Sequence, residues 1–367
     1  MRRATQGCFL ICLVLAILCV GLALAAWIAT DGQLLGAAQR AILRIQISGQ
    51  AKELNAPYSN DNRPVRFHIP LGAGAGAIAA ALAEARLIRD SELFVDYARL
   101  EGYDRRFEAG VYFLDQTQSI KRIAEILTDS SKSFIPFRSV EGARIEELAE
   151  RIDRNGLFGF SGADFLEVVG AGADLPAEFA AWASIPPAAS LEGFMFPDTY
   201  QLPPDMTASG LRDTLLRAFR ARVGDDLRAA ALSQGLSLHQ VVTLASIIER
   251  EAVWRDEHAM IASVYRNRLA INMNLEADPT VQYSLHGARG NWWPQITRAD
   301  YRAVNSPYNT YLYGDLPPGP IASPGLSAII AAIHPAASSY FFFRAACDNS
   351  YYHVFAVSYE EHLAKAC

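Results

Sequence analysis

The chain has 367 residues, of which 51% are hydrophobic and 20% are charged, a composition typical of globular proteins of two or three domains rather than of disordered ones. Its 33 Lys and Arg residues stand against 39 Asp and Glu residues, which gives a formal charge of −6. Arg2 and Arg3 are the only charged residues before Asp31, so the rest of the chain carries −8. We therefore expect no nucleic-acid partner, because phosphate binding requires a basic face.

An uncharged segment near the N-terminus predicts a membrane-spanning helix. Residues 8–29 are apolar throughout, which satisfies the roughly 20 residues that a spanning helix needs. The positive-inside rule then predicts that residues 1–30 form a cytoplasmic stub and a single transmembrane helix in the cytoplasmic (inner) membrane, with all later residues extracytoplasmic, in the periplasm. A cleaved signal peptide is the alternative, although this apolar segment is longer than the ~7 to 15 residues of a signal core.

Cys347 and Cys367 are the two cysteines that follow the apolar segment. They could form one disulfide if their compartment is oxidising, or remain two free thiols. Neither these cysteines nor the seven histidines show the spacing of a metal site. The glycine-rich stretch at 70–79 does not have the order of a dinucleotide-binding loop. We therefore expect no metal and no cofactor.

The hydrophobic pattern predicts an α+β protein with two folded parts. Residues 31–64 end in a stretch rich in Asn, Asp and Pro and are interpreted as a linker. Residues 65–135 form a small βααβα unit, and residues 136–367 form a larger domain of mixed helices and strands. In the small unit we expect strands at 65–69 and 108–114 and helices at 77–88, 91–103 and 119–131.

An internal repeat links the two parts. When Gly72 is aligned with Gly142, apolar residues of the two following helices coincide at a constant offset of 70 residues. Each copy is predicted to consist of a strand, a turn at a glycine, a helix and a short apolar segment after the helix. The repeat indicates either a duplication or the general similarity of any strand, turn and helix.

The larger part alternates helices with loop-rich passages. Loop-rich passages at 171–207 and 272–325 contain many aromatic residues, which could stack on sugar rings or fill an irregular core. The aromatic residues in question are Tyr283, Trp292, Trp293, Tyr301, Tyr308, Tyr311 and Tyr313. The expected helices are 207–234, 238–255, 256–271 and 326–334, followed by closing strands at 339–346 and 351–358.

The helix expected at 238–255 carries two glutamates within an apolar sequence. Ser237 and Gln240 form a capping box that marks its start. On a helix, Glu251 would have Arg255 four residues further on, so a surface ion pair would explain it. Glu249 would have only small and apolar neighbours one turn away. A carboxyl without a partner in apolar surroundings has a raised pKa, as a general acid requires, so Glu249 is the candidate acid. The alternative is that a polar group of another segment bonds Glu249 or that its side chain reaches solvent.

Seven motifs resemble those of one enzyme family. In chain order they are "LEGFMFPDTY" (191–200), "LASIIEREA" (244–252), "SVYRNRL" (263–269), "DPTVQY" (278–283), "SPYNTY" (306–311), "LPPGPIASPG" (316–325) and "HPA" (334–336). Together they closely resemble the endolytic murein transglycosylases of the MltG/YceG-like family. The resemblance extends more loosely to that family's LysM-like subdomain at residues 65–135 and to its N-terminal membrane anchor. Two positions depart from the family's pattern: Ala252, where threonine is frequent, and Asn305, where aspartate is.

The resemblance implies a membrane-anchored lytic transglycosylase that cuts nascent peptidoglycan strands between N-acetylmuramic acid and N-acetylglucosamine. The reaction uses no water, leaves a 1,6-anhydromuramyl end and would terminate strand elongation. The resemblance also implies membrane-bound peptidoglycan synthases as partners, and it implies Glu249 as the catalytic residue. From the motifs we select Glu192, Asn309 and Tyr311 as candidate substrate-binding residues, although Asn309 and Tyr311 could instead hold their loop in place.

A single glutamate could perform this reaction by protonating the glycosidic oxygen and then accepting the proton of the sugar's own C6 hydroxyl. A muramidase that uses water would need a second carboxylate, for which Glu192, Asp198 and Asp278 are the candidates. Asp198 and Asp278 are more simply explained as turn formers. A noncatalytic peptidoglycan-binding scaffold is the third interpretation.

Overall fold

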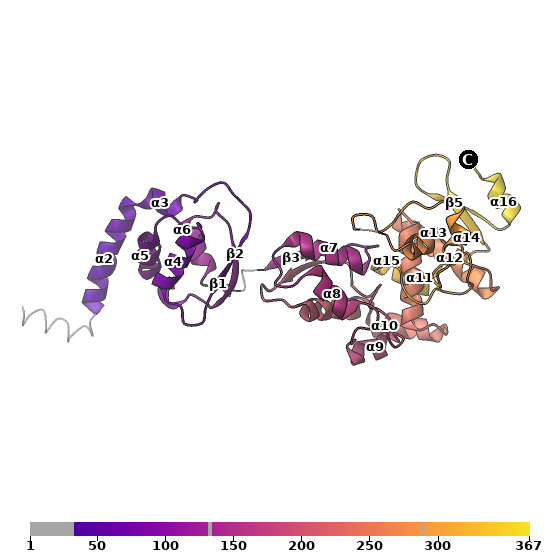
Figure 1. Ribbon diagram of the computed structural model, residues 1–367, viewed down its shortest axis with the longest axis horizontal. Helices are drawn as coiled ribbons and strands as arrows, with labels where there is room; N and C mark the ends of the chain where they lie inside the picture. Colours follow the sequence, from indigo (N-terminus) through magenta and orange to yellow (C-terminus); the bar gives the residue numbers. More distant parts are fainter. Residues whose placement is uncertain (1–32, 131–133, 288) are drawn as a thin grey trace, which may run out of the picture. The chain divides into compact units, whose positions relative to one another are not determined.

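The computed structural model describes residues 33–130, 134–287 and 289–367, with side chains from residue 41 onward (Figure 1). The transmembrane helix expected at 8–29 lies outside the described residues. Contacts divide the chain into two compact units, Met1–Phe134 and Ile135–Cys367. Among the described helices, none by itself has the length and hydropathy that a membrane crossing needs. Helices α10 (Ala208–Ser233) and α11 (Leu238–Glu251) meet the criterion only as a pair bent by 99°.

The first unit contains the predicted βααβα order. Its two strands pair antiparallel, with Phe67 opposite Tyr112, and both of these aromatic side chains are buried. Asp90 and Ser119 cap the helices that follow them, because each side chain accepts a backbone N–H of the first turn. The LysM-like character of this unit remains a prediction. The elements are α2 (Gln33–Gly49), α3 (Ala51–Asn55), β1 (Val65–Ile69), α4 (Ala75–Glu84), α5 (Ser91–Glu101), η1 (Tyr103–Arg105), β2 (Gly110–Leu114) and α6 (Ile120–Ile126).

The segment expected as a linker contributes to the first unit. Helices α2 and α3 occupy residues 33–55, and Ile47 and Leu54 on them are buried in the same apolar core as α4, α5 and α6. The amphipathic character of the segment supplies this apolar face. Only the Pro- and Asn-rich residues that follow α3 lack regular structure over most of their length.

The second unit is a helical body with two small antiparallel sheets, in agreement with the α+β prediction. Its helix α10 is interrupted at Gly224, where the backbone leaves the helical conformation. Four elements in the passages expected to be loop-rich are regular, namely α9, β4, α13 and α14. The elements are β3 (Ile135–Arg138), α7 (Ile145–Asn155), α8 (Gly162–Val169), α9 (Ala177–Ala183), β4 (Thr199–Leu202), α10 (Ala208–Ser233), α11 (Leu238–Glu251), η3 (Arg255–Glu257), α12 (His258–Ala270), α13 (Asp278–Ser284), α14 (Asp300–Ala303), α15 (Leu326–Ile333), β5 (Phe342–Ala345), β6 (His353–Ala356) and α16 (Tyr359–Ala364).

The 70-residue repeat corresponds to a repeated order of elements. In both copies a strand leads through a glycine with positive φ, Gly72 or Gly142, into two helices, and a later strand pairs antiparallel with the first. Phe94 and Phe165, which the repeat aligns within one residue, are both fully buried on the second of these helices. The common pattern therefore describes the same local architecture twice.

Helix α11 forms the centre of the second unit and contacts α10, α12, α13 and α15 (Figure 1). The capping box of Ser237 and Gln240 is present as predicted. The helix is shorter than expected, however, because Ala252 adopts an extended conformation with φ −91° and ψ 136°. The chain therefore turns away directly after Glu251, which places both glutamates in the last turn.

Cys347 and Cys367 form a disulfide, which decides between the two interpretations of these residues. The bond joins the loop after β5 to the end of the chain beyond α16. It closes a loop with a sequence separation of 20 residues.

We expect the double substitution Cys347→Ser and Cys367→Ser to lower the free energy of unfolding by about 3 kcal/mol, because loop closure then no longer restricts the unfolded chain. Urea denaturation with and without reductant measures the effect. Because the variant lacks the bond, reductant should not change its stability. A loss of stability on reduction that is as large in the variant as in the wild type would contradict this explanation.

Candidate active site

Glu251, the last residue of α11, has the properties of a general acid. Its side chain is half-buried, and Tyr265 of α12 donates a hydrogen bond from its hydroxyl to Oε1 at 2.8 Å. Burial raises the pKa of this carboxyl to about 7, with Asp278 repelling the ionised form, while the Tyr265 hydrogen bond and Arg268 favour ionisation. A carboxyl with a pKa near 7 can both give and accept a proton at neutral pH.

Tyr265 is a dependable donor to this carboxyl. Its side chain is 1% exposed, and burial together with the neighbouring Glu251 keeps the phenol pKa far above its ordinary value. The phenol therefore stays protonated. The other carboxyl oxygen, Oε2, has no hydrogen bond to any residue that the structure describes and is not enclosed. A substrate oxygen can approach it there.

Glu249 lies two residues earlier and has a different environment. Its Oε2 accepts a hydrogen bond from the backbone N–H of Gly325 at 3.0 Å, directly before α15. Burial raises its pKa, and the Gly325 hydrogen bond opposes this shift; nearby Glu141 raises it further. Both glutamates thus have raised pKa values. Glu249 in addition ties the end of α11 to the start of α15.

The predicted ion pair between Glu251 and Arg255 is wrong. Arg255 instead pairs with Glu141, which comes from the loop before α7. The four-residue spacing does not bring Glu251 and Arg255 together, because the helix has ended at Glu251. A surface ion pair therefore does not account for Glu251, while the raised pKa predicted for Glu249 is present, so both glutamates are candidates for the acid.

Glu251 opens into a polar cavity of about 760 Å³. The walls come from the end of α11, from α12 and α13, from the segment around α14 that contains Arg298, Tyr301 and Tyr311, and from β5, β6 and α16. Carboxylates, arginines and aromatic rings alternate around it. Such a mixture suits a ligand with hydroxyl, amide and charged groups.

Tyr311 and Asp278 share this cavity with Glu251. The Tyr311 hydroxyl donates to Asp278 Oδ1 at 2.6 Å, and the Tyr311 ring stacks on Tyr301 with a centroid separation of 4.1 Å. The structure therefore brings one predicted substrate-binding residue, Tyr311, to the cavity. It also brings Asp278 there, which the sequence had favoured as a turn former.

Asn309 is enclosed and holds the loop. Its side chain is 0% exposed and donates to the carbonyl oxygens of Tyr301 and Val304, at 3.1 and 2.8 Å. Its Oδ1 accepts the backbone N–H of Tyr311 at 3.0 Å. Asn309 therefore positions Tyr311 and offers no free group to a sugar in this structure.

Glu192 is also enclosed, at 1% exposure, away from any open surface. It accepts backbone N–H groups from Ile145 and Gly193, both at 3.3 Å. Burial raises its pKa to about 8, and Glu146 adds to this, while Arg144 opposes it. In this structure a sugar cannot reach Glu192, so the structure does not support the predicted substrate-binding role of this residue.

Trp292 and Trp293 hold their loop against α7 through hydrogen bonds. The Trp292 indole donates to Glu150 at 2.6 Å and that of Trp293 to Glu147 at 3.0 Å. Their rings also contact cations, with the Arg250 guanidinium 3.9 Å from the Trp293 ring centre. The two tryptophan rings therefore support the loop. Of the seven aromatic residues named from the sequence, Tyr301 and Tyr311 line the cavity.

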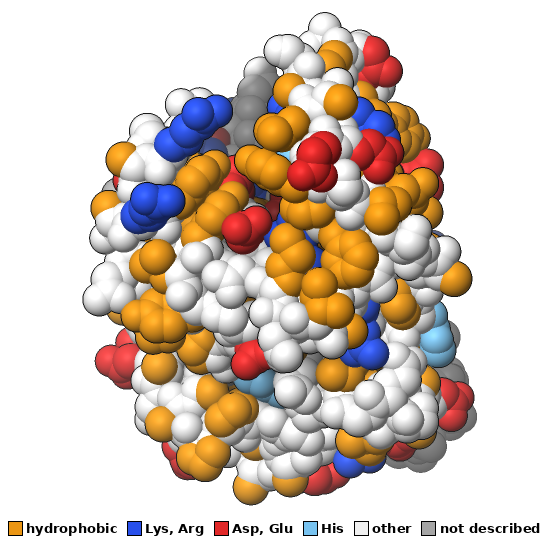
Figure 2. All heavy atoms as spheres, turned by 90° about the vertical axis from the view of Figure 1, so that its right-hand side faces the viewer, with side chains coloured by type: hydrophobic (Ala, Val, Ile, Leu, Met, Phe, Trp, Pro, Cys, Tyr) orange, Lys and Arg blue, Asp and Glu red, His pale blue; other side chains and the backbone are white. Residues whose placement is uncertain are grey.

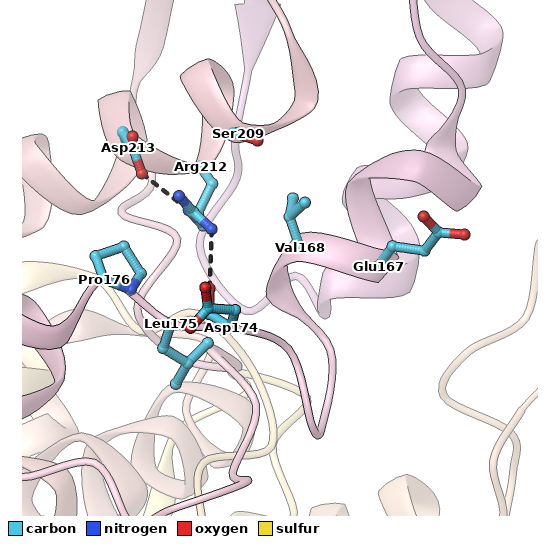
Figure 3. A pocket seen from close by; sticks show the side chains of 8 residues that line it. All are labelled: Glu167, Val168, Asp174, Leu175, Pro176, Ser209, Arg212 and Asp213. Carbon is cyan, nitrogen blue, oxygen red and sulfur yellow. Dashed lines mark hydrogen bonds and ion pairs between the residues drawn. The ribbon is translucent and has the colours of Figure 1, made fainter.

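Another hollow, of about 500 Å³, lies between α8 and α10 (Figure 3). Its Arg212 lies between Asp213, 2.8 Å away, and the Asp174 carbonyl, 3.2 Å away, while Glu167 points away from it. Its cation is thus already paired. The molecular face drawn in Figure 2 shows charged side chains of both signs scattered among hydrophobic ones. The cavity at Glu251 combines a carboxyl of raised pKa with a second carboxylate and two stacked tyrosine rings, so it is the candidate active site.

Comparison with known proteins agrees with the motifs. The model of the YceG-like family matches residues 67–366, which is most of the chain. The chain belongs to this family. A solved structure of a yceG-like protein from Listeria monocytogenes is 28% identical, covers 82% of this chain and 99% of its own, and superimposes with a TM-score of 0.54.

Two relatives of this YceG-like protein carry the name endolytic murein transglycosylase. The one from Bacillus subtilis (strain 168) is 29% identical over 332 residues, which cover 85% of this chain and 86% of the relative. The one from Streptococcus pneumoniae serotype 2 is 28% identical over 315 residues and covers 78% of this chain. The chain spans 55% of the length of the streptococcal relative.

We expect Tyr265→Phe to move the pH profile of this YceG-like protein. Removing the phenol hydrogen bond destabilises ionised Glu251, so its pKa rises by roughly one unit, the equivalent of about 1.4 kcal/mol. The loss of activity with increasing pH should then occur roughly one pH unit higher than in the wild type. Initial rates of peptidoglycan cleavage between pH 5 and 9 measure this, and a profile unchanged in position would contradict it.

Proposed function

We propose that this protein is a lytic transglycosylase that cleaves peptidoglycan between N-acetylmuramic acid and N-acetylglucosamine, with Glu251 as the general acid and base. The observation that carries the proposal is a carboxyl of pKa about 7 at the edge of a polar cavity. The family and the names of the relatives supply the substrate and the reaction type.

In the proposed reaction, protonated Glu251 gives its proton to the glycosidic oxygen as the bond from that oxygen to C1 of the muramic acid breaks. Positive charge develops at C1 in the transition state. The C6 hydroxyl oxygen of the same sugar then bonds to C1, and its proton passes to the Glu251 carboxylate. This restores the acid and consumes no water.

Asp278 would assist electrostatically. The Tyr311 hydroxyl donates to one of its oxygens at 2.6 Å, and Tyr301 lies at 3.4 Å from the other. A carboxylate that accepts these bonds is fixed in place and can stabilise a positive charge at C1. The stacked Tyr301 and Tyr311 rings would present an aromatic surface to the sugar.

Glu249, the acid predicted from the sequence, remains the alternative for the catalytic role. It too has a pKa raised by burial. The cavity distinguishes the two residues, because Glu251 lines it together with Tyr311 and Asp278. We therefore assign Glu249 to the anchoring of α15 and Glu251 to the chemistry.

A water-using muramidase is the second candidate function, favoured by the presence of Asp278 in the same cavity as Glu251. Two carboxylates are what such a hydrolase requires. Digestion of purified peptidoglycan with residues 31–367, followed by mass spectrometry, separates the two reactions. We expect 1,6-anhydro ends, one water lighter than reducing ends. Reducing ends would favour the muramidase, and intact strands would favour a noncatalytic scaffold.

The setting in the cell is a further part of the proposal. The apolar residues 8–29 support a single membrane anchor with the N-terminus in the cytoplasm and the catalytic unit in the periplasm. From this position the enzyme would cut nascent strands next to membrane-bound synthases and so end their elongation. Membrane fractionation of the full chain and of a version without residues 1–30 tests the anchor; release of only the shortened chain is expected.

A further inference from the structure

The cavity at Glu251 contains two arginines without an acidic partner. Arg298 and Arg344 both line it, and neither forms an ion pair with any described residue. Arg344 is half-buried on β5, and its Nε is enclosed without a hydrogen-bond partner. Its one hydrogen bond to a residue that the structure describes is a long one, 3.5 Å from Nη1 to the His362 carbonyl. The enclosed Nε cannot be reached from the cavity, so an acceptor bound there would contact the guanidinium through its Nη groups.

The acidic groups of the cavity do not neutralise these arginines. Glu276 pairs with Arg268 at 3.4 Å, and Asp278 takes the Tyr311 hydroxyl. Glu251 is bonded to Tyr265. Arg268 differs from Arg344, because it is 6% exposed and bonds to the Phe341, Asn274 and Leu275 carbonyls. Arg344 is therefore the half-buried cation whose guanidinium still has N–H groups without hydrogen bonds to described residues.

The β5–β6 hairpin, which carries Arg344, is held in place by strand pairing and by the disulfide. Arg344 pairs with Val354 across the β5–β6 hairpin, and the disulfide at Cys347, three residues later, fastens this hairpin to the chain beyond α16. His362 of α16 lies beside it, and burial together with Arg344 lowers the His362 pKa. Figure 1 shows β5 and α16 together at the C-terminal end of the second unit. A rigidly held guanidinium can bind a carboxylate through two parallel hydrogen bonds.

From these contacts we propose that Arg344 forms a subsite for a carboxylate carried by the N-acetylmuramic acid residue of the substrate. This inference rests on the proposed function and adds specificity to it. A strand that bears peptide stems presents carboxylates of the stem, and a strand without stems presents the free carboxylate of the lactyl group. In both cases Arg344 would distinguish the muramic acid from N-acetylglucosamine, which has no carboxylate.

The test measures binding in the Glu251→Gln background, so that strands are not consumed. Three purified glycan strands serve as probes: with peptide stems, with stems removed by an amidase, and with the freed lactyl carboxylates reduced to alcohols. Arg344→Gln removes the charge, and Arg344→Lys retains it. Arg217→Gln, an exposed arginine on α10, is the matched control. Thermal melting verifies that each variant is folded.

We expect Arg344→Gln to weaken binding of carboxylate-bearing strands about 10- to 100-fold, the effect of losing a hydrogen bond to a charged group. Arg344→Lys should restore part of it, and Arg217→Gln should have no effect. Loss with stem-bearing strands alone identifies the stem as the source, and loss with stem-free strands alone identifies the lactyl group.

Equal weakening for the carboxyl-reduced strands, or no weakening at all, would overturn the proposal. If Arg344-dependent binding is present while wild-type protein cleaves none of these strands, the proposed function fails and the subsite stands. If cleavage yields anhydro ends but binding is independent of Arg344, the subsite fails alone.

Discussion

Substitution of Glu251 by Gln is expected to reduce peptidoglycan cleavage by about 10²- to 10⁴-fold, the contribution of a positioned general acid. Gln has nearly the same shape and can still accept the hydroxyl of Tyr265, which donates to Oε1 at 2.8 Å in the wild type. It cannot deliver a proton to a glycosidic oxygen. The loss should therefore appear in kcat, while binding of strands changes little.

Glu249→Gln is the matched control for this experiment. Its carbonyl oxygen can accept the Gly325 N–H as the carboxylate does, so the link to α15 is preserved. We expect this variant to keep activity within about tenfold of the wild type. The opposite ranking, with Glu249→Gln inactive and Glu251→Gln active, would assign the acid role to Glu249 and refute the assignment made from the cavity.

The second large effect is expected from Glu192, in the dependence of stability on pH. Its folded pKa of about 8 lies above the ordinary value of 4.5, because the carboxyl is buried. Below pH 4.5 both states hold the proton, and between 4.5 and 8 the unfolded state releases it while the folded state keeps it. The free energy of unfolding should thus fall by roughly 5 kcal/mol as pH rises through this window.

Glu192→Gln removes this titration and isolates its contribution. We expect the variant to gain stability relative to the wild type as pH rises from 5 to 8.5, measured by urea unfolding at both values. Glu167→Gln, at an exposed position on α8, controls for the removal of a charge. A difference between wild type and Glu192→Gln that is the same at both pH values would show that Glu192 is already ionised in the folded protein.

Local sequence patterns predicted much of the fold because they act over a few residues. The capping box at Ser237 and the order of the βααβα unit depend on neighbours in sequence, and both are present. The end of α11 was not predictable in this way. Ala252 has a high helix propensity, yet it leaves the helix, and Trp254 just beyond donates to the Ser350 carbonyl 96 positions away.

The environments of the two glutamates also depend on contacts with residues distant in sequence, which local patterns do not predict. Arg255 stands four positions after Glu251, but its partner is Glu141, 114 positions earlier. The hydrogen bond of Glu249 comes from Gly325, 76 positions later in the sequence. The motifs singled out Asp278 and Tyr311 as candidates, but their meeting in one cavity depends on contacts between segments distant in sequence. Arg344 lies outside every motif, and no signal in the sequence distinguished it from other arginines.

Oxygen-18 labelling tests most directly whether one carboxyl performs a reaction without water. Wild-type protein is incubated with purified peptidoglycan strands in water enriched in oxygen-18, and the new ends are examined by mass spectrometry. If the C6 hydroxyl oxygen of the muramic acid bonds to C1 and gives its proton to Glu251, the new ends are 1,6-anhydro and contain no label. Reducing ends that carry one labelled oxygen for each bond cut would contradict the mechanism and identify a hydrolase.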